Sequence, residues 1–248
     1  MLTAPAHVHQ IRLAGQAAAP PGPCDLTPMY LMHHAFRRDL RRFGEAVANT
    51  PVADRRTWLA LDRRWQRFAR ILHHHHNGED EILWPTLLTR VDAAGDADGR
   101  AALEAMEAEH DEIEPLLTGC AAGFERLAVG ADEDTRAALA VRVAATAERL
   151  GHHLSHAEST AMVVLQAHLT QAEWHAMDAG FAAHYSFADA LFAVPWVLDG
   201  LPDDVRRTVL RTFPAALALS WRVVLRRRHE RRERRIFGPA RRRAVEEG

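Results

Sequence analysis

The sequence has few cysteines and no segment typical of a signal peptide or a membrane span. Its two cysteines, Cys24 and Cys120, form no Cys-x-x-Cys pair, which excludes a cysteine-based zinc finger and a disulfide framework. The apolar runs are short and interrupted, and no basic start followed by an apolar core opens the chain. We therefore expect a cytoplasmic protein that does not interact with a membrane.

Lysine is absent, so each of the 31 cationic side chains other than histidine is an arginine. The formal net charge of −2 argues against a protein that is basic throughout, but arginines are concentrated from Arg222 to Arg243. Glu230 and Glu233 neutralise only part of that charge. Because no DNA-reading motif accompanies the run and Phe237 is its only aromatic residue, the pattern favours a solvated face over a nucleic-acid-binding surface.

Apolar residues recur at alternating steps of three and four residues in four long segments, a spacing that predicts amphipathic helices. These stripes run through residues 29–47, 58–86, 103–127 and 139–164. Short breaks that contain Pro, Gly or Asp separate them. Four amphipathic helices with short connections indicate an all-α fold, an antiparallel up-down four-helix bundle.

We predict that the bundle occupies residues 26–168. Residues 1–25 are rich in Ala, Pro and Gly and have no apolar periodicity, so we interpret them as a flexible N-terminal arm. Residues 169–248 begin with a capping box, from Thr170 to Glu173, and contain further helical patterns. This segment is predicted to form a C-terminal helical extension that packs outside the bundle and ends in the arginine-rich run.

Residues 73–76 are four consecutive histidines, and carboxylates follow one helical turn later. Two pairs have the i, i+4 spacing that places side chains on one helix face, namely His75 with Glu79 and His76 with Asp80. Only the first pair continues the apolar stripe of its helix. We therefore predict that His75 and Glu79 bind a metal ion, which removes the desolvation cost of burying them unpaired. We interpret the other three histidines of the run, His73, His74 and His76, as residues of a solvated face.

A histidine also replaces an apolar residue on the stripe of each of the other three helices. These residues are His33, His110 and His153. Bundles build metal sites from ligands that project inward from facing helices, and the four stripe histidines repeat at a nearly constant interval, since 110 − 33 = 77 and 153 − 75 = 78. An alternative stays open, in which the histidines are hydrogen-bonded core residues that bind metal incidentally.

Four motifs around these histidines resemble those of a known family. They are His33 followed by Phe36-Arg37-Arg38, His75-xxx-Glu79 followed by Ile82-Leu83-Trp84-Pro85, Glu109-His110-Asp111, and His153-Leu154 with Glu158. Over residues 29–165 the chain resembles the hemerythrin-like HHE cation-binding family, four-helix bundles that hold a non-heme diiron centre. The helices beyond residue 168 resemble a C-terminal extension found in actinobacterial-type members.

The resemblance implies two iron ions, with manganese as an alternative metal, held by imidazoles and carboxylates. The implied ligands are His33, His75, Glu79, His110, Glu114, His153 and Glu158, with Glu79 and Glu158 as bridges. Glu114 stands where oxygen-carrying hemerythrins have a fifth histidine. Glu158 follows His153 at i+5, a spacing that requires a local bulge in the helix, and His156 is the competing donor.

This ligand set predicts a redox-active diiron protein that reacts with O2, peroxide or nitric oxide, including oxidase- or peroxidase-type chemistry. Exchange of a neutral imidazole for Glu114 favours the ferric state over reversible oxygen carriage. The alternative is an iron or oxygen sensor, in which metal binding orders the bundle and the C-terminal helices report it to a protein partner. A substrate pocket beside the metals would favour the first function, and metal-dependent partner binding the second.

Overall fold

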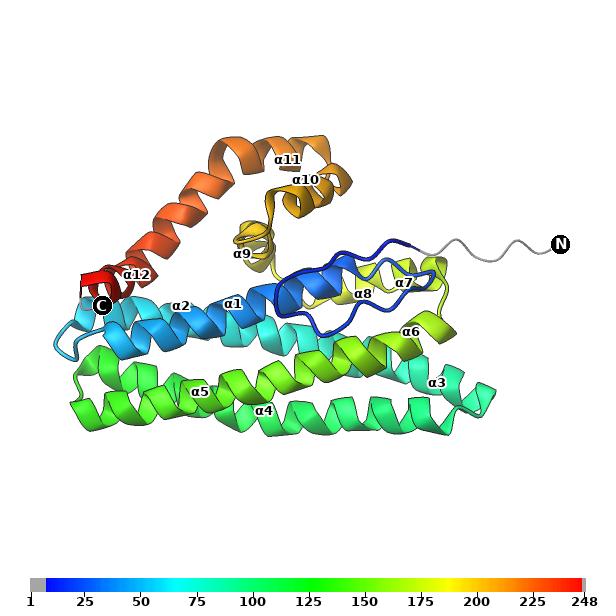
Figure 1. The fold of residues 1–248 in the computed structure, drawn as a ribbon, viewed down its shortest axis with the longest axis horizontal. Helices are drawn as coiled ribbons and strands as arrows, with labels where there is room; N and C mark the ends of the chain where they lie inside the picture. Colours follow the sequence, from blue (N-terminus) through cyan, green and yellow to red (C-terminus); the bar gives the residue numbers. More distant parts are fainter. Residues whose placement is uncertain (1–7, 247–248) are drawn as a thin grey trace.

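Four helical rods run side by side in the computed structural model, which describes residues 8–246 (Figure 1). The first rod is α1 (Thr27–Asn49) and the third is α4 (Ala97–Val129). The second rod consists of α2 (Arg55–Gly78), the π-helical segment η1 (Glu79–Leu83) and α3 (Trp84–Ala94). The fourth consists of α5 (Glu133–His156), the π-helical segment η2 (Ala157–Ala161) and α6 (Met162–His168). No strand occurs among the described residues, so the predicted all-α bundle is confirmed.

Aspartates start three of the four rods. Asp54, Asp96 and Asp132 each accept a hydrogen bond from a backbone N–H in the first turn of α2, α4 and α5. These caps satisfy N–H groups that a helix start leaves unpaired, and each stabilises its helix by about 1 kcal/mol. The connections between rods are short, so consecutive rods run antiparallel. α4 packs between α2 and α5, and α1 closes the bundle against the same two helices.

The core of the bundle consists of two apolar clusters. One surrounds the rings of Phe43, Trp65 and Phe124, and the other contains Met106 and Leu165. Between them lies a buried polar layer, which the four rods build together. Its members are His33, His75, His76, Glu79, His110 and His153. Polar groups in the middle of a core are costly unless they are paired, so this layer requires a specific compensation.

The π-helical segments lie beside the polar layer in the second and fourth rods. Their i→i+5 backbone hydrogen bonds span one residue more than those of an α-helix, and such bulges occur frequently at functional sites. η2 supplies the local bulge that the spacing of His153 and Glu158 was expected to require. α3 ends the second rod at Ala94, where Gly95 adopts the left-handed conformation with φ 69°.

The part of the predicted flexible arm that the structure describes, residues 8–25, lies against the bundle. Cys24 is fully buried, and the side chain of Gln10 donates a hydrogen bond to its carbonyl oxygen. The backbone N–H of Ala17 donates to the carboxylate of Glu158. Hydrogen bonds of backbone and polar side-chain groups hold this segment in place, and they leave no apolar periodicity in the sequence. The sequence pattern therefore did not reveal these contacts. Residues 1–7 of the predicted arm lie outside the described residues.

The extension lies outside the bundle, as Figure 1 shows. It leaves the fourth rod, rises away from the bundle, and returns toward α1 and α2 through its last helix. The elements of the extension are α7 (Gln171–Ala176), α8 (Asp178–Ala183), α9 (Phe187–Leu198), α10 (Asp203–Thr212), α11 (Ala215–Ser220), the π-helical η3 (Trp221–Leu225) and α12 (Arg226–Glu246). α8 packs on α2, and α9 packs on α1.

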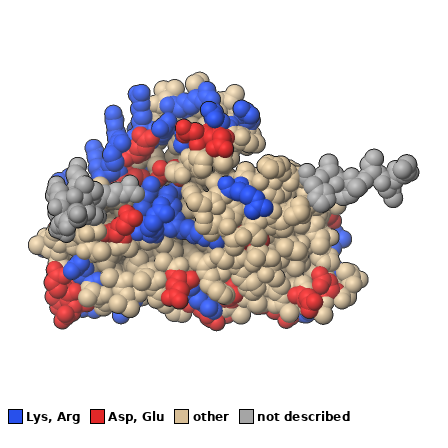
Figure 2. Space-filling view, in the orientation of Figure 1, with Lys and Arg blue, Asp and Glu red and all other residues tan. Residues whose placement is uncertain are grey.

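The arginine-rich helix α12 has a buried side as well as a solvated one. Figure 2 shows arginine side chains gathered on the part of the molecule that the extension forms. On the opposite side of α12, the ring of Phe237 packs 5.4 Å from that of Phe43, and Glu233 accepts a hydrogen bond from Arg64. The predicted solvated face is therefore correct for only part of this helix. None of the helices among the described residues has the length and hydropathy that a membrane-spanning segment needs.

Candidate metal centre

The polar layer contains two groups of three side chains, and within each group the ligand atoms lie within 4.8 Å of one another. The first group is His33, His75 and Glu79. α1 contributes His33, and the junction of α2 with η1 contributes the other two residues. Nε2 of His75 lies 3.6 Å from Oε1 of Glu79, and all three residues are buried.

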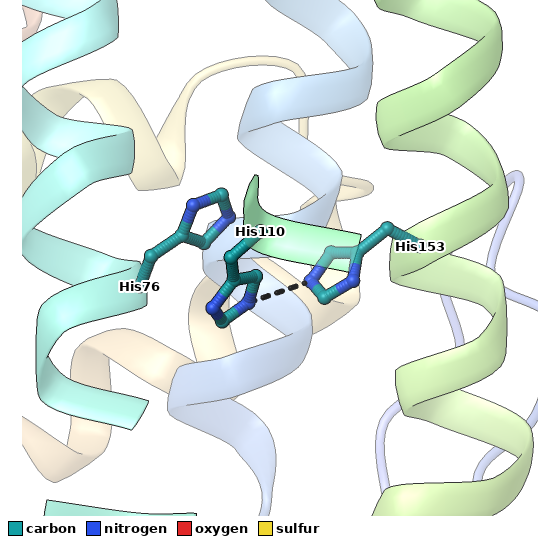
Figure 3. A group of neighbouring side chains, drawn as sticks. All are labelled: His76, His110 and His153. Carbon is teal, nitrogen blue, oxygen red and sulfur yellow. Dashed lines mark hydrogen bonds between the residues drawn. The ribbon is translucent and has the colours of Figure 1, made fainter. Parts of the chain in front are cut away.

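The second group is His76, His110 and His153, from α2, α4 and α5 (Figure 3). Their imidazole rings converge on one point between the three helices. Nε2 of His110 lies 3.2 Å from Nε2 of His153, and the rings of His76 and His110 stack with their centroids 3.9 Å apart. Imidazole rings that project inward from three facing helices are the arrangement by which helical bundles hold a metal ion.

Glu79 connects the two groups. Its Oε1 faces His75 of the first group, whereas its Oε2 lies 3.4 Å from Nε2 of His110 in the second group. Burial opposes ionisation of this carboxyl group, but the surrounding imidazoles of His75 and His110 outweigh it and lower the pKa of Glu79 to about 2. The side chain is therefore a carboxylate at neutral pH, with one oxygen directed at each group.

Carboxylates outside the two groups hold three of the imidazoles by Nδ1. The Nδ1 atoms of His33, His110 and His153 contact Glu158, Asp80 and Glu109 at distances of 3.0, 2.8 and 2.9 Å. A carboxylate at Nδ1 fixes the tautomer and the orientation of a metal-binding histidine, and it directs Nε2 toward the ion. The geometry around each ring is thus the one found around metal ligands.

Several atoms that face the inside of the layer have no hydrogen-bond partner although they are buried. They are Nε2 of His33, His75 and His76 and both carboxylate oxygens of Glu79. Each unsatisfied buried polar atom costs about 1–3 kcal/mol. A metal ion in each group would compensate for this cost, so the residues present fit a metal centre.

The protonation states of the imidazoles agree with metal binding. Burial lowers the pKa of His75 to about 4 and holds the pKa of His76 well below its ordinary value, so both rings are neutral near pH 7 and have a free lone pair. Burial also lowers the pKa of His110, but the hydrogen bond to Asp80 and the nearby charge of Glu79 outweigh burial and raise this pKa to about 9. A metal ion at Nε2 would replace the proton held there.

Of the seven residues named from the sequence, the structure brings five into the polar layer: His33, His75, Glu79, His110 and His153. Glu158 is buried beside them, but its oxygens accept hydrogen bonds from His33 and Arg37. Glu114 lies exposed on α4 and belongs to neither group, so the argument that rested on its charge loses its basis. His156 contacts Glu109 and belongs to neither group.

His76 is the site residue that the sequence pattern missed. The pattern assigned it to a solvated face, yet it is 5 % exposed and completes the second group. Adjacent residues on an α-helix point about 100° apart, so one apolar stripe does not include both His75 and His76. They point into neighbouring parts of the layer, one toward each group. The signal available in the sequence was the His run itself, together with Asp80 one turn later.

A third group, Asp199, His229 and Glu233, also lies within the distances of a metal site. Guanidinium groups already neutralise it, because Arg42 pairs with Asp199 across 2.7 Å and Arg64 with Glu233 across 3.3 Å. This group links α12 to the bundle and is not a second metal centre.

A comparison with protein-family models matches the chain with the hemerythrin HHE cation binding domain over residues 26–165. This range covers the four rods except the last three residues of α6, and it includes every member of the polar layer. The chain belongs to the hemerythrin HHE cation-binding family. Searches of curated proteins and of solved structures found no match.

Membership of the hemerythrin HHE family establishes cation binding by a helical bundle, and the two histidine groups are where this chain offers the ligands. The matched range ends at residue 165, so the extension that follows α6 is an addition to the hemerythrin domain. It accounts for the helices α7 to α12 outside the bundle.

Proposed function

We propose that the two groups bind two iron ions, with manganese as the alternative metal, and that Glu79 bridges them. The observation that carries the proposal is the position of Glu79, whose two oxygens face different groups. A buried carboxylate that interacted with a single ion would have no reason to contact imidazoles of both groups. His33 and His75 would hold one ion. His76, His110 and His153 would hold the other.

We further propose that this centre reacts with O2, peroxide or nitric oxide. A pair of redox-active ions supplies the electrons for such chemistry when it is bound. Five imidazoles and one shared carboxylate are fewer ligands than two six-coordinate ions need, and open positions distinguish reactive metal sites from structural ones. Asp80, Glu109 and Glu158 orient the imidazoles, and the apolar clusters on both sides keep bulk water out of the layer.

A sensor function is the second candidate, and two contacts between the second rod and α8 favour it. Phe181 of α8 lies directly over Gly78, the residue before Glu79, so closely that a Cβ added to Gly78 would be 2.7 Å from its ring. Ile82 of η1 packs in the same way against Gly180. A shift of η1 on metal binding would therefore move α8 and the extension with it.

Metal analysis and absorption spectroscopy test the proposal. We expect about two metal ions per chain after anaerobic iron reconstitution, and near-ultraviolet absorption that changes on addition of O2, peroxide or nitric oxide. The Glu79→Gln variant should lose the absorption of the bridged pair, whereas the exposed His73→Ala variant should retain it. A metal content near zero after reconstitution would contradict the proposal.

A further inference from the structure

A cavity of about 410 Å³ lies beside the first metal-ligand group, where the extension covers the bundle. His75 and Glu79 form part of its wall, and Met29 and Met32 of α1 form another part. The remaining wall comes from the extension, on α7, α8 and α9 and in the turn between α8 and α9. More than half of the lining residues therefore lie beyond residue 165, outside the matched hemerythrin domain.

The chemistry of the lining selects an apolar occupant. The extension contributes Trp174, Phe181, Tyr185 and Val194, and the bundle contributes the two methionines. Aromatic rings and thioethers bind apolar molecules by dispersion and by burial of surface. Because an apolar cavity of about 150 Å³ holds one benzene ring, the space here is sufficient for roughly two fused rings.

The charges around the cavity favour an uncharged molecule. Asp178 places a carboxylate in the wall, which disfavours a bound anion. No arginine lines the cavity among the described residues. The metal ions proposed for the adjacent group would in turn repel a bound cation. Tyr185 packs against His74 in the same wall and offers a hydroxyl group for a polar substituent.

We infer that this cavity binds a neutral, apolar organic molecule with about two rings, and holds it next to His75 and Glu79 as the substrate of the metal centre. Binding follows from the cavity alone, whereas the role as substrate rests on the proposed dinuclear function. The extension converts a bundle that handles small gaseous or peroxide ligands into one that also holds an organic molecule beside them.

Naphthalene is the probe, and its binding to the full-length protein is measured by calorimetry with and without metal. We expect saturable binding of similar affinity in both forms, and weaker binding of 2-naphthoate. Ala182 lines the cavity and Ala183 does not, although both are exposed residues of α8. Ala182→Trp should weaken binding about tenfold or more, and the matched Ala183→Trp should leave it unchanged, with helicity and metal content retained in both.

Loading the protein with Mn²⁺ tests proximity to the centre, because a paramagnetic ion at His75 should broaden the proton resonances of bound naphthalene. Absence of saturable binding, equal effects of the two tryptophan variants, or tighter binding of 2-naphthoate would overturn the inference. Metal binding without naphthalene binding would refute the cavity assignment and leave the metal proposal intact. Naphthalene binding without metal uptake would refute the substrate role and the proposed function, while the apolar site would stand.

Discussion

Nδ1 of His33 donates a hydrogen bond to Oε1 of Glu158 across 3.0 Å, and Arg37 donates to the same carboxylate from the other side. Glu158 therefore orients a proposed ligand and is itself saturated by hydrogen bonds. We predict that Glu158→Gln weakens metal affinity about 10- to 100-fold without changing the number of ions bound at saturating metal. Competition with a chromophoric chelator measures the affinity. Loss of a whole ion in this variant would show that Glu158 is a direct ligand.

His76 and His73 lie one turn apart on α2 but differ in exposure, which makes them a matched pair. We predict that His76→Ala reduces the bound metal from about two ions to about one, because it removes one of three imidazoles from the second group. His73→Ala should change neither metal content nor stability. Elemental analysis of the two purified variants checks this, and equal metal content in both would remove His76 from the centre.

The metal-free protein should lose stability in mild acid. Burial lowers the pKa of His75 to about 4, whereas an unfolded histidine has a pKa of about 6.5. Between those values the unfolded chain takes up a proton that the folded chain does not, so the free energy of unfolding falls as the pH drops from about 6.5 to about 4. Urea unfolding of chelator-treated protein measures this slope.

Replacement of His75 by Asn is the control for the acid effect and should make the slope shallower. The effect of His110 on the pH dependence of stability is opposite, since the pKa of His110 is raised to about 9. Its contribution to stability is fully present below the unfolded pKa of about 6.5 and is lost as the pH rises through about 9. A metal-free protein whose free energy of unfolding increases steadily on acidification from neutral pH would disagree with the burial of His75.

The arginine-rich end contributes to stability through its apolar side. The sequence favoured a solvated face for this run, but Phe237 is buried against Phe43. We predict that Phe237→Ala lowers the free energy of unfolding by about 3 kcal/mol. The exposed Arg235→Ala variant should change it by no more than about 0.5 kcal/mol. Chemical denaturation distinguishes the two, and equal stabilities would mean that α12 does not pack on the bundle in solution.

Gly78 provides a test of the contact between the metal centre and the extension. A Cβ at this position would meet the ring of Phe181, whereas a Cβ at Gly44 in α1 would meet nothing within 4 Å. Gly44→Ala should therefore stabilise the protein by about 0.5–1 kcal/mol, the usual gain inside a helix. Gly78→Ala should not, and should make α8 more sensitive to limited proteolysis. Equal gains in both variants would show that Phe181 does not rest on Gly78.

The sequence predicted the all-α bundle because apolar stripes of period 3.6 are a strong signal over long helices. The sequence prediction failed in the second rod, where the spacing of the buried residues changes. The predicted stripe of the second rod continued from Glu79 to Ile82 and Thr86, but the buried residues are Leu83 and Leu87, one position later. η1 causes this shift, because a π-helical turn contains one additional residue.

Positions in the polar layer were predictable from the sequence where a histidine replaces an apolar residue on a helical stripe, as His33 and His110 do. It was not predictable where the contact depends on tertiary structure. Whether Glu158 faces a metal ion or Arg37 depends on packing between α1 and η2, and no spacing along one helix encodes that choice. The same holds for the cavity, whose wall joins residues of α1 to residues of α9.

The π-helical segment η1 has a consequence for the position of Glu79 in the metal-free protein. If η1 relaxed to an α-helical turn, the following residues would rotate by about 100°, and Trp84 and Leu87 would leave the core. The packing of α3 therefore opposes relaxation whether or not a metal is bound. Glu79 is consequently held in position before the ions arrive. The apolar contacts of α3 thus fix this one ligand in advance, so ordering Glu79 adds no entropic cost to ion binding.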